Sequence, residues 1–253
     1  MIKIKTEEEI EKMSHGGKIL SEVLSEVIDS IKPGVSEIEL DSVAEKLILE
    51  KGGKPGFKEV EGYKNAICVS TNSVVVHGIP SNYKIKEGDV VGIDCGVFYK
   101  GFHTDMAETV RVKNSKAQND NIDKFLEIGK KALNEAVKIA KAGNRIGDIS
   151  KTIQNIVEKE NGYSVVRSLV GHGVGRQLHE DPEVPGFLVG DRNTTAVLKK
   201  GMTIAVEVIY NMGGRDVEVL SDNWTIKTRD KSMSGVFERT IAITDNDPLI
   251  LTQ

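Results

Sequence analysis

Single acidic side chains interrupt apolar segments at corresponding places in the two halves of this sequence. In each half a His-Gly dipeptide precedes a Lys-x-Gly turn, and a carboxylate lies shortly after the turn, at Asp94 and at Glu207. The strings KEGDVVGIDCG and KKGMTIAVEVI align without a gap, so these two acids occupy equivalent positions. An ionised carboxylate in a core strand is unfavourable unless a cation or hydrogen-bond donors compensate it. The repeat therefore predicts one site shared by both halves.

Further ligand candidates accompany this pair. Asp105 and Glu238 are again single acids in apolar strands, and His172 lies in GHGVG, where glycines leave the imidazole uncrowded. Two aspartates, two glutamates and one histidine suit hard divalent ions such as Mn, Fe or Co better than a structural zinc site. Two such ions can share a water, lower its pKa and polarise a carbonyl, which favours hydrolysis.

Other interpretations of these residues stay open. An acid on a strand is most often solvated, and Glu207 and Glu238 are also candidates for buried ion pairs with Arg239 or Arg215. A lone histidine is more often a surface residue or a core residue with satisfied hydrogen bonds than a ligand. We assign two histidines to that class, His15 and His103.

The elements that must position these side chains can be predicted from periodicity. Apolar residues recur every three or four positions across 10–31, and a capping box of Ser36 and Glu39 starts a second helix that ends at Gly52-Gly53. A shift of 109 residues repeats this pattern in the second half, so each half is predicted to be two helices followed by strands. The predicted strands are 66–70, 74–76, 90–98, 104–112, 164–170, 203–210, 224–228 and 236–244.

Tyr99-Lys100-Gly101-Phe102 is predicted to join two of these strands as a hairpin. In that register Gly96 faces Asp105 and Asp94 faces Ala107. Both aspartates then project from one face as diagonal neighbours, within reach of the same ion or ion pair.

Composition excludes several classes of protein. The 253 residues include 34 basic and 38 acidic side chains, and no run of like charges predicts nucleic-acid or membrane binding. The acidic start and the lack of a long apolar run predict a cytoplasmic protein. Cys68 and Cys95 are predicted to be reduced, structural thiols. Without a linker, the chain is expected to be one domain, 1–253, with internal halves of roughly 1–113 and 114–253.

The motifs together resemble the type I methionine aminopeptidase family of the pita-bread metallopeptidases. The resemblance runs through VVVHGIP, GIDCGVFYKGFHTD, GHGVGRQLHEDPEVP, the strand bearing Glu207, WTIKT and FERTIAIT. It implies an α+β pita-bread fold, in which a curved antiparallel sheet is backed by helices and the two halves are related by a pseudo-twofold axis.

The resemblance also implies roles for individual residues. Asp105 and Glu238 would bridge two divalent ions (Co, Mn, Fe or Zn), and a bridging hydroxide would attack the scissile carbonyl. His77 and His179 would hold the substrate amide and stabilise the tetrahedral intermediate, while Glu207 would also move the proton to the leaving amine. The implied metal ligands are Asp94, Asp105, His172, Glu207 and Glu238. The implied methionine pocket is Phe57, Val60, Tyr63, His77, Leu178 and Trp224, of which Phe57 and Val60 fit core packing equally well.

The sequence departs from the family pattern at several positions. Val208 stands where proline is usual and Arg239 where histidine is usual, but neither residue is an implied ligand. Phe57 and Val60 replace a common cysteine and tyrosine, and Leu178 replaces a phenylalanine. These departures affect the preference for methionine more than peptidase activity.

The activity that the resemblance implies is removal of the initiator methionine from nascent chains whose next residue is small. The expected partners are nascent N-termini, including those at the ribosome, with no nucleic acid or membrane, and the protein is expected to be a monomer. Two alternatives remain. A proline-directed aminopeptidase or dipeptidase of the same fold normally has an extra N-terminal domain, and a non-catalytic binding module would have lost ligands.

Overall fold

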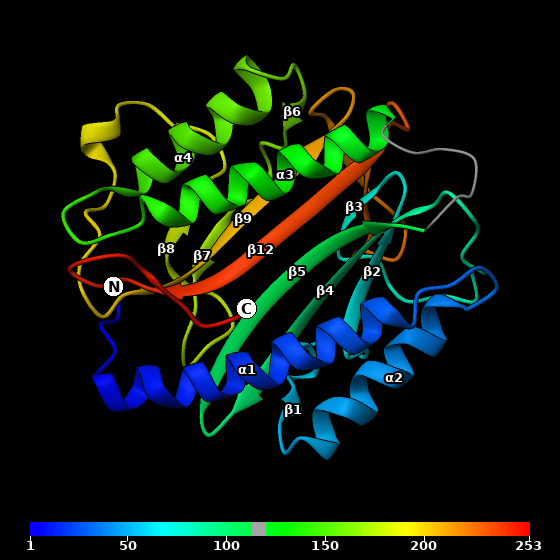
Figure 1. Cartoon of the computed structure of the whole chain (residues 1–253), viewed down its shortest axis with the longest axis horizontal. Coiled ribbons are helices and arrows are strands. Elements are labelled where there is room, and N and C mark those ends of the chain that lie inside the picture. The colour runs from blue at the N-terminus through cyan, green and yellow to red at the C-terminus, as the bar shows by residue number, and fades with distance from the viewer. Residues whose placement is uncertain (113–119) are drawn as a thin grey trace.

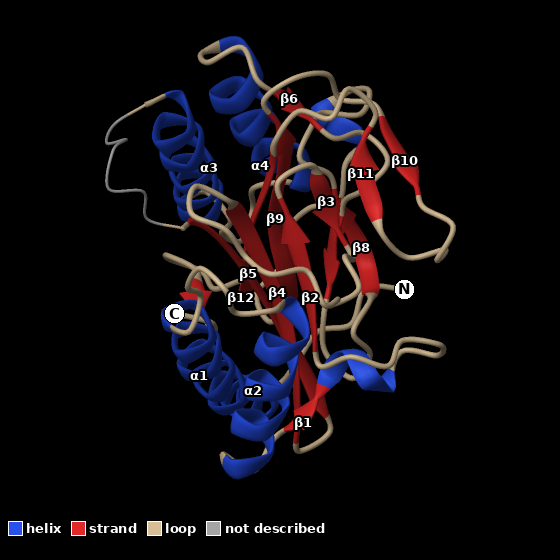
Figure 2. Ribbon diagram, turned by 90° about the vertical axis from the view of Figure 1, so that its right-hand side faces the viewer, coloured by secondary structure: helices blue, strands red, loops and turns tan. Residues whose placement is uncertain are grey.

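The computed structural model describes residues 1–112 and 120–253, in which two pairs of α-helices cover one face of a layer of strands (Figures 1 and 2). The first pair comes from the first half of the chain and the second pair from the second half. α4 continues into a π-helical turn, η2 (Asn155–Lys159). The helices are α1 (Glu7–Asp29), α2 (Glu37–Glu50), α3 (Asn121–Lys138) and α4 (Ile146–Gln154).

Side-chain caps define where the helices begin. The Glu9 N–H donates to Thr6 Oγ1 over 3.2 Å and the Thr6 N–H donates to Glu9 Oε2 over 2.9 Å, so a capping box starts α1. At α2 the carboxylate of Glu39 accepts from the N–H of Ser36, as the predicted capping motif required. Asp120 accepts from Ile122 N–H and starts α3.

The strands form antiparallel sheets in which each half contributes a long central pair. β4 pairs with β1, β2 and β5, whereas β9 pairs with β12, β7 and β6. β8 extends the second sheet from β7, β13 borders β12, and β3, β11 and β10 form a smaller sheet. The strands are β1 (Lys54–Pro55), β2 (Ile67–Thr71), β3 (Val74–Val76), β4 (Val90–Tyr99), β5 (Phe102–Arg111), β6 (Ser164–Val165), β7 (Gly171–Gly173), β8 (Glu180–Val184), β9 (Thr203–Asn211), β10 (Val217–Val219), β11 (Ile226–Thr228), β12 (Ser234–Ala242) and β13 (Leu249–Ile250).

The predicted hairpin between β4 and β5 is confirmed. Tyr99 pairs with Phe102, and the turn residues Lys100 and Gly101 both have positive φ, 46° and 89°, as a type I′ turn requires. The register places Gly96 opposite Asp105 and Asp94 opposite Ala107.

The two halves meet where β5 and β12 run side by side across the middle of the sheet (Figure 1). Among the described residues no main-chain ladder joins these strands; threonine hydroxyls link them. Thr240 Oγ1 donates to the carbonyl of Asp105 over 2.8 Å and accepts from its N–H over 2.9 Å. Thr109 makes the same pair of bonds with the main chain of Val236, at 2.7 and 2.9 Å. Side chains therefore set the spacing at this seam.

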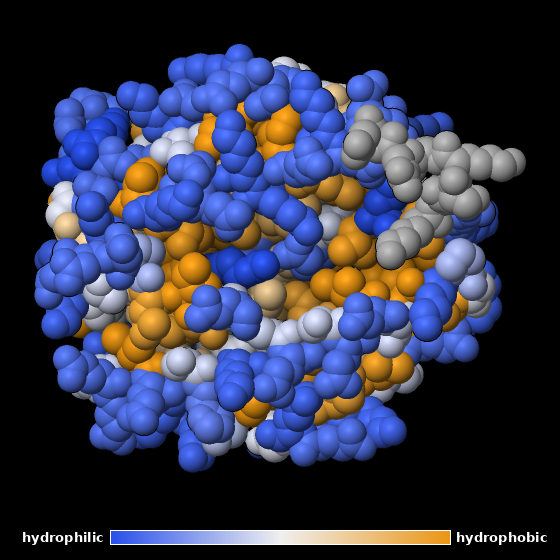
Figure 3. Space-filling view, in the orientation of Figure 1, coloured by the Kyte–Doolittle hydropathy of each residue, from blue (hydrophilic) through white to orange (hydrophobic). Residues whose placement is uncertain are grey.

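Each helix pair packs on its own half of the sheet through a separate apolar cluster. α1 and α2 bury Leu20 and Leu40 against β2 and β4, whereas α3 and α4 bury Phe125 and Ile149 against β9 and β12. On this helix-covered face hydrophilic residues dominate the outer rim, and apolar residues show in the trough between the helix pairs (Figure 3).

The opposite face of the sheet carries irregular structure. β3, β8, β10, β11 and the N-terminus lie there (Figure 2), as does the 3₁₀ turn η1 (Gly56–Glu59); a second such turn, η3 (Arg192–Thr194), lies in the second half. None of the helices in the described part of the chain is long and apolar enough to cross a membrane.

Most predicted elements are present with ends shifted by a few residues, but one strand is largely wrong. The segment predicted as a strand over 164–170 forms β6 only at Ser164–Val165, since it leaves the sheet before Gly171. The sequence analysis also missed the short strands β1, β10 and β13 and the strands β7 and β8, whose strings GHG and EDPEV contain a single strand-forming residue, Val184.

Candidate metal centre and active site

Four acids from both halves face one another across the seam. Asp94 is the fifth residue of β4 and Glu207 the fifth residue of β9, which confirms that the repeat places them equivalently. Glu238 on β12 lies directly opposite Glu207. Asp105 on β5 is fixed through the Thr240 hydroxyl to the strand that carries Glu238. Asp105 and Glu238 are 4% and 3% exposed, so their carboxylates lie inside the protein.

His172 completes this group from β7. The ligand atoms of Asp105, His172 and Glu238 lie within 4.8 Å of one another. His172 Nδ1 is 2.8 Å from the carbonyl oxygen of Gly173, so it is the nitrogen that carries the proton. Nε2 is then free to act as a ligand, and it lies 3.5 Å from Glu207 Oε1.

Burial dominates the electrostatics of the acids. It raises the pKa of Asp94 to about 7, although a hydrogen bond with Asp105 acts in the opposite direction. Burial, followed by the charges of Glu238 and Asp94, raises the pKa of Asp105 well above its usual range. The pKa values of Glu207 and Glu238 are also raised well above the usual range by burial and by neighbouring acids. Four acids this close cannot all be ionised unless a cation joins them.

The polar atoms of the group fit a divalent cation. Asp94 Oδ1 and Glu238 Oε1 are sealed from solvent and have no hydrogen-bond partner. Buried oxygens of this kind are normally satisfied, and oxygen donors with one imidazole are the ligands that hard and borderline divalent ions prefer. The residues present therefore match the metal that the sequence predicted.

The alternative of buried ion pairs for Glu207 and Glu238 is wrong. Arg239 donates to the carbonyl oxygen of Glu238 at 2.7 Å and to the carboxylate of Glu108 at 2.8 Å, so it crosses from β12 to β5. Arg215 is exposed. Within the described residues neither Lys nor Arg forms an ion pair with the carboxylate of Glu207 or Glu238.

Two further histidines face the same cavity. His77 follows β3 in a left-handed conformation with φ of 56°. The ring of His179 stands edge-on to the ring of His172, with centroids 4.4 Å apart. Desolvation lowers the pKa of both His77 and His179, although His179 also reaches solvent at the cavity mouth. Both imidazoles are therefore predominantly neutral at neutral pH.

Glycine follows His77 and His172 for a steric reason. A Cβ on Gly78 would lie 2.0 Å from the carbonyl oxygen of Val69, and one on Gly173 would lie 2.1 Å from that of Asp181. Close backbone approach therefore requires glycine in both His-Gly dipeptides.

A cavity of about 600 Å³ joins the acids to an apolar pocket on the side of the sheet away from the helices. Tyr63 and Trp224 form an edge-on pair with ring centroids 5.1 Å apart, and the Tyr63 hydroxyl donates to the Ile67 carbonyl over 2.8 Å. All the sequence-predicted residues of the site line this cavity: Phe57, Val60, Tyr63, His77, Asp94, Asp105, His172, Leu178, His179, Glu207, Trp224 and Glu238.

The sequence analysis missed other residues of the cavity wall. Cys68 was predicted to be a structural thiol; it is reduced and buried, but it also lines the cavity. It lies directly opposite Asp94 in the β2–β4 ladder, so the register of β2 against β4 would have revealed it. Met1, Lys3 and Glu180 also line the cavity, and no local signal marks them. His15 is exposed, as assigned. His103 is buried, but its Nδ1 has no hydrogen-bond partner among the described residues, so it is not the satisfied core histidine that was predicted.

Comparison with known proteins adds an independent observation. Residues 11–245 match the model of metallopeptidase family M24. The methionine aminopeptidase of Clostridium perfringens is 43% identical over 252 residues, which span 100% of this chain and 99% of that protein. The crystal structure of a methionine aminopeptidase from Thermotoga maritima matches with a TM-score of 0.95 and 42% identity over 100% of both chains. A prolidase from Pyrococcus furiosus matches with a TM-score of 0.79 and 28% identity, over 99% of this chain and 65% of that one. The predicted α+β pita-bread fold is thereby confirmed.

Proposed function

The chain belongs to metallopeptidase family M24, and we propose that it removes the N-terminal methionine from polypeptides whose second residue is small. The observation that carries this proposal is one cavity in which a cluster of acids and an imidazole adjoins an aromatic pocket. Relatives that match over their whole length support the choice, since they are named methionine aminopeptidases.

Members of this family use divalent metal, and we propose that two ions bind here. Asp94, Asp105, His172, Glu207 and Glu238 would hold them, with Asp105 and Glu238 shared between the two. Bound in this way, Co, Mn, Fe or Zn would polarise the scissile carbonyl and lower the pKa of a shared water.

The protein's own residues would then orient the substrate and move protons. His179, neutral because desolvation lowers its pKa, would donate a hydrogen bond to the carbonyl oxygen as negative charge develops there. His77 would hold the scissile amide from the other side of the cavity. The carboxylate of Glu207 would take the proton from the attacking water and deliver it to the leaving amine.

The pocket beside these groups would accept the methionine side chain. An unbranched thioether packs well on aromatic edges and faces, which Tyr63 and Trp224 supply in their edge-on arrangement. Phe57 and Leu178 bury the remaining wall and are 6% and 7% exposed. We therefore expect these four side chains to determine which N-terminal side chains the pocket accepts.

We propose that the substrates are nascent polypeptides in the cytoplasm, including those at the ribosome, and that the protein acts as a monomer and a single domain. Three tripeptides, incubated with each of the four divalent ions, would test the activity. Release of methionine from Met-Ala-Ser but not from Met-Lys-Ser, with Ala-Pro-Ala uncut, is the expected result. Cleavage of Ala-Pro-Ala alone would favour a proline-directed peptidase, and no cleavage with any ion a binding module.

A further inference from the structure

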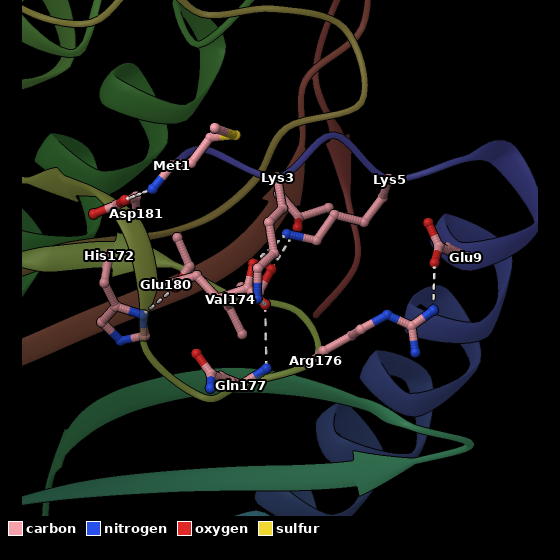
Figure 4. A network of polar contacts seen from close by, with 12 residues as sticks. Met1, Lys3, Lys5, Glu9, His172, Val174, Arg176, Gln177, Glu180 and Asp181 are labelled. Atoms are coloured by element: carbon pink, nitrogen blue, oxygen red, sulfur yellow. Dashed lines mark hydrogen bonds and ion pairs between the residues drawn. The ribbon is translucent and has the colours of Figure 1, made fainter.

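The loop that carries His179 is held by the N-terminal segment of the chain. This loop, residues 174–179, connects β7 to β8, and the first nine residues run along its outer side (Figure 4). Lys5 Nζ donates to Glu180 Oε2 over 2.7 Å, and Arg176 Nη2 donates to Glu9 Oε1 over 2.7 Å. The segment therefore makes one ionic contact within the loop, at Arg176, and one directly after it, at Glu180.

The contact of Lys5 with Glu180 differs from an ordinary surface ion pair. The two side chains are 4% and 2% exposed, whereas Lys3, 3.5 Å from the other oxygen of Glu180, is 50% exposed. Removing one partner of a buried pair leaves a charge without compensation, which a surface pair does not. Lys5 is thus the lysine that fixes Glu180.

Glu180 transmits this contact to the loop. Its Oε1 accepts from the Gln177 N–H over 3.2 Å, so the carboxylate spans the segment in which His179 lies. The Gly175 carbonyl accepts from the His103 N–H over 2.7 Å and anchors the loop to the hairpin on its other side.

The loop sequence is also shaped to receive the lysine. A Cβ on Gly175 would lie 2.4 Å from Lys5 Cε and 2.7 Å from its Nζ. Gly175 is not among the glycines with positive φ, so a side chain there would meet no backbone strain but would displace the end of the Lys5 side chain from its present position. The Lys5 N–H donates to the Gly201 carbonyl over 2.8 Å, which fixes the base of the side chain.

We propose that Lys5 is a positioning residue for His179, and that its buried ammonium group acts through Glu180 to hold the imidazole toward the substrate. This inference rests on the proposed function only in giving His179 a contact with the scissile amide. A loop that fluctuates by about 1 Å is enough to lower turnover, since catalytic geometry tolerates little displacement.

The kinetic test replaces Lys5 by methionine, which keeps an unbranched stem of similar length and removes the charge. With Met-Ala-Ser and saturating Mn²⁺, kcat of Lys5→Met should fall roughly tenfold or more while KM changes by less than about threefold. The control Lys12→Met also removes one lysine from the N-terminal part of the chain, here from an exposed ion pair with Glu8, and should stay within about twofold of wild type. Lys5→Arg, which restores a cation, should recover part of kcat.

Two further variants separate positioning from stability. In a His179→Ala background, Lys5→Met should cause no further loss, because the group it positions is gone; the same fold-loss in both backgrounds would overturn the proposal. If Lys5→Met folds poorly, the double variant Lys5→Met/Glu180→Gln carries no uncompensated charge. It should fold like wild type and still lose kcat, and wild-type kcat would overturn the proposal.

Hydrogen exchange of the metal-free protein gives a readout that does not depend on activity. Amides of residues 174–179, above all the Gln177 N–H, should exchange faster in Lys5→Met than in wild type, and at the wild-type rate in Lys12→Met. Unchanged exchange in Lys5→Met would refute the role of Lys5. If wild type releases no methionine with any ion, the proposed function fails, and faster exchange still supports the hold of Lys5 on the loop.

Discussion

Removal of metal should give a folded protein whose stability falls as the pH rises above about 6.5, where histidines no longer titrate in the unfolded chain. Folding raises the pKa of Asp94 from 3.8 to about 7, and burial raises the pKa values of Asp105, Glu207 and Glu238 as well. Between these two pKa values the native state retains protons that the unfolded chain has lost. Each proton retained in this way lowers the free energy of unfolding by roughly 1.4 kcal/mol per pH unit.

The size of the effect can be worked out for Asp94. A shift from 3.8 to about 7 is about three pKa units, which corresponds to about 4 kcal/mol when the pH exceeds both values. Water that reaches the half-buried side chain reduces this amount. The native state has its full stability at a pH below the Asp94 pKa of the unfolded chain, and it has lost this amount once the pH has risen through the Asp94 pKa of the folded protein. Metal should reverse the loss, since ions that bind only the native state stabilise it.

Urea unfolding in EDTA, followed by circular dichroism from about pH 6.5 to pH 9 at fixed ionic strength, measures this dependence. Below this range the histidines of the site, whose pKa values folding lowers, act in the opposite direction. Asp94→Asn should flatten the dependence, exceed wild type in stability above about pH 7 and gain less from added Mn²⁺. A matched control is Asp230→Asn, because Ser232 and Gly214 lower the pKa of this exposed acid and its replacement should leave the slope unchanged. Metal-free wild type with flat or rising stability over this range would refute the reasoning.

Three other outcomes are expected at the site. Asp105→Asn or Glu238→Gln should abolish release of methionine, because each removes charge from a position shared by two ions; near-normal turnover would contradict the sharing. His179→Ala should lose on the order of 10²-fold in kcat, as expected for a lost oxyanion donor, with metal content by elemental analysis unchanged. Thr240→Val, which breaks both bonds to the main chain of Asp105, should weaken Mn²⁺ binding in calorimetry by roughly tenfold, and unaltered affinity would argue against the seam as the source of ligand spacing.

The hairpin shows how far local sequence can predict the site. The two-residue alternation of β-strands and the positive-φ turn at Lys100-Gly101 fix which residues face one another, so the placement of Asp94 and Asp105 followed from sequence. The start of α2 followed in the same way from its capping box of Ser36 and Glu39. These features depend on residues a few positions apart, whose relative placement is determined by backbone geometry and local hydrogen bonds.

The missed parts depend on contacts that are distant in sequence. His172 lies on β7, whose three residues Gly171–Gly173 carry no strand pattern, because the sheet around them supplies the conformation. Lys5 and Glu180 are separated by 175 positions, and a lysine near a chain start ordinarily indicates nothing more than a solvated side chain. Cys68 was predicted to be a core thiol because the strand that carries it is apolar. The sequence does not indicate that one face of this strand lines a cavity.

The seam between the halves explains why the acids can converge without a continuous ladder. If β5 and β12 were joined by main-chain hydrogen bonds, their spacing would be the fixed interval of a β-sheet. Thr109, Thr240 and Arg239 make the connection instead, through bonds from side chain to main chain. The distance between Asp105 and Glu238 is therefore determined by side-chain identity, and substitution at these three positions can alter it without changing either ligand. Arg239 thereby clamps the seam, since it joins the carboxylate of Glu108 on β5 to the main chain of β12.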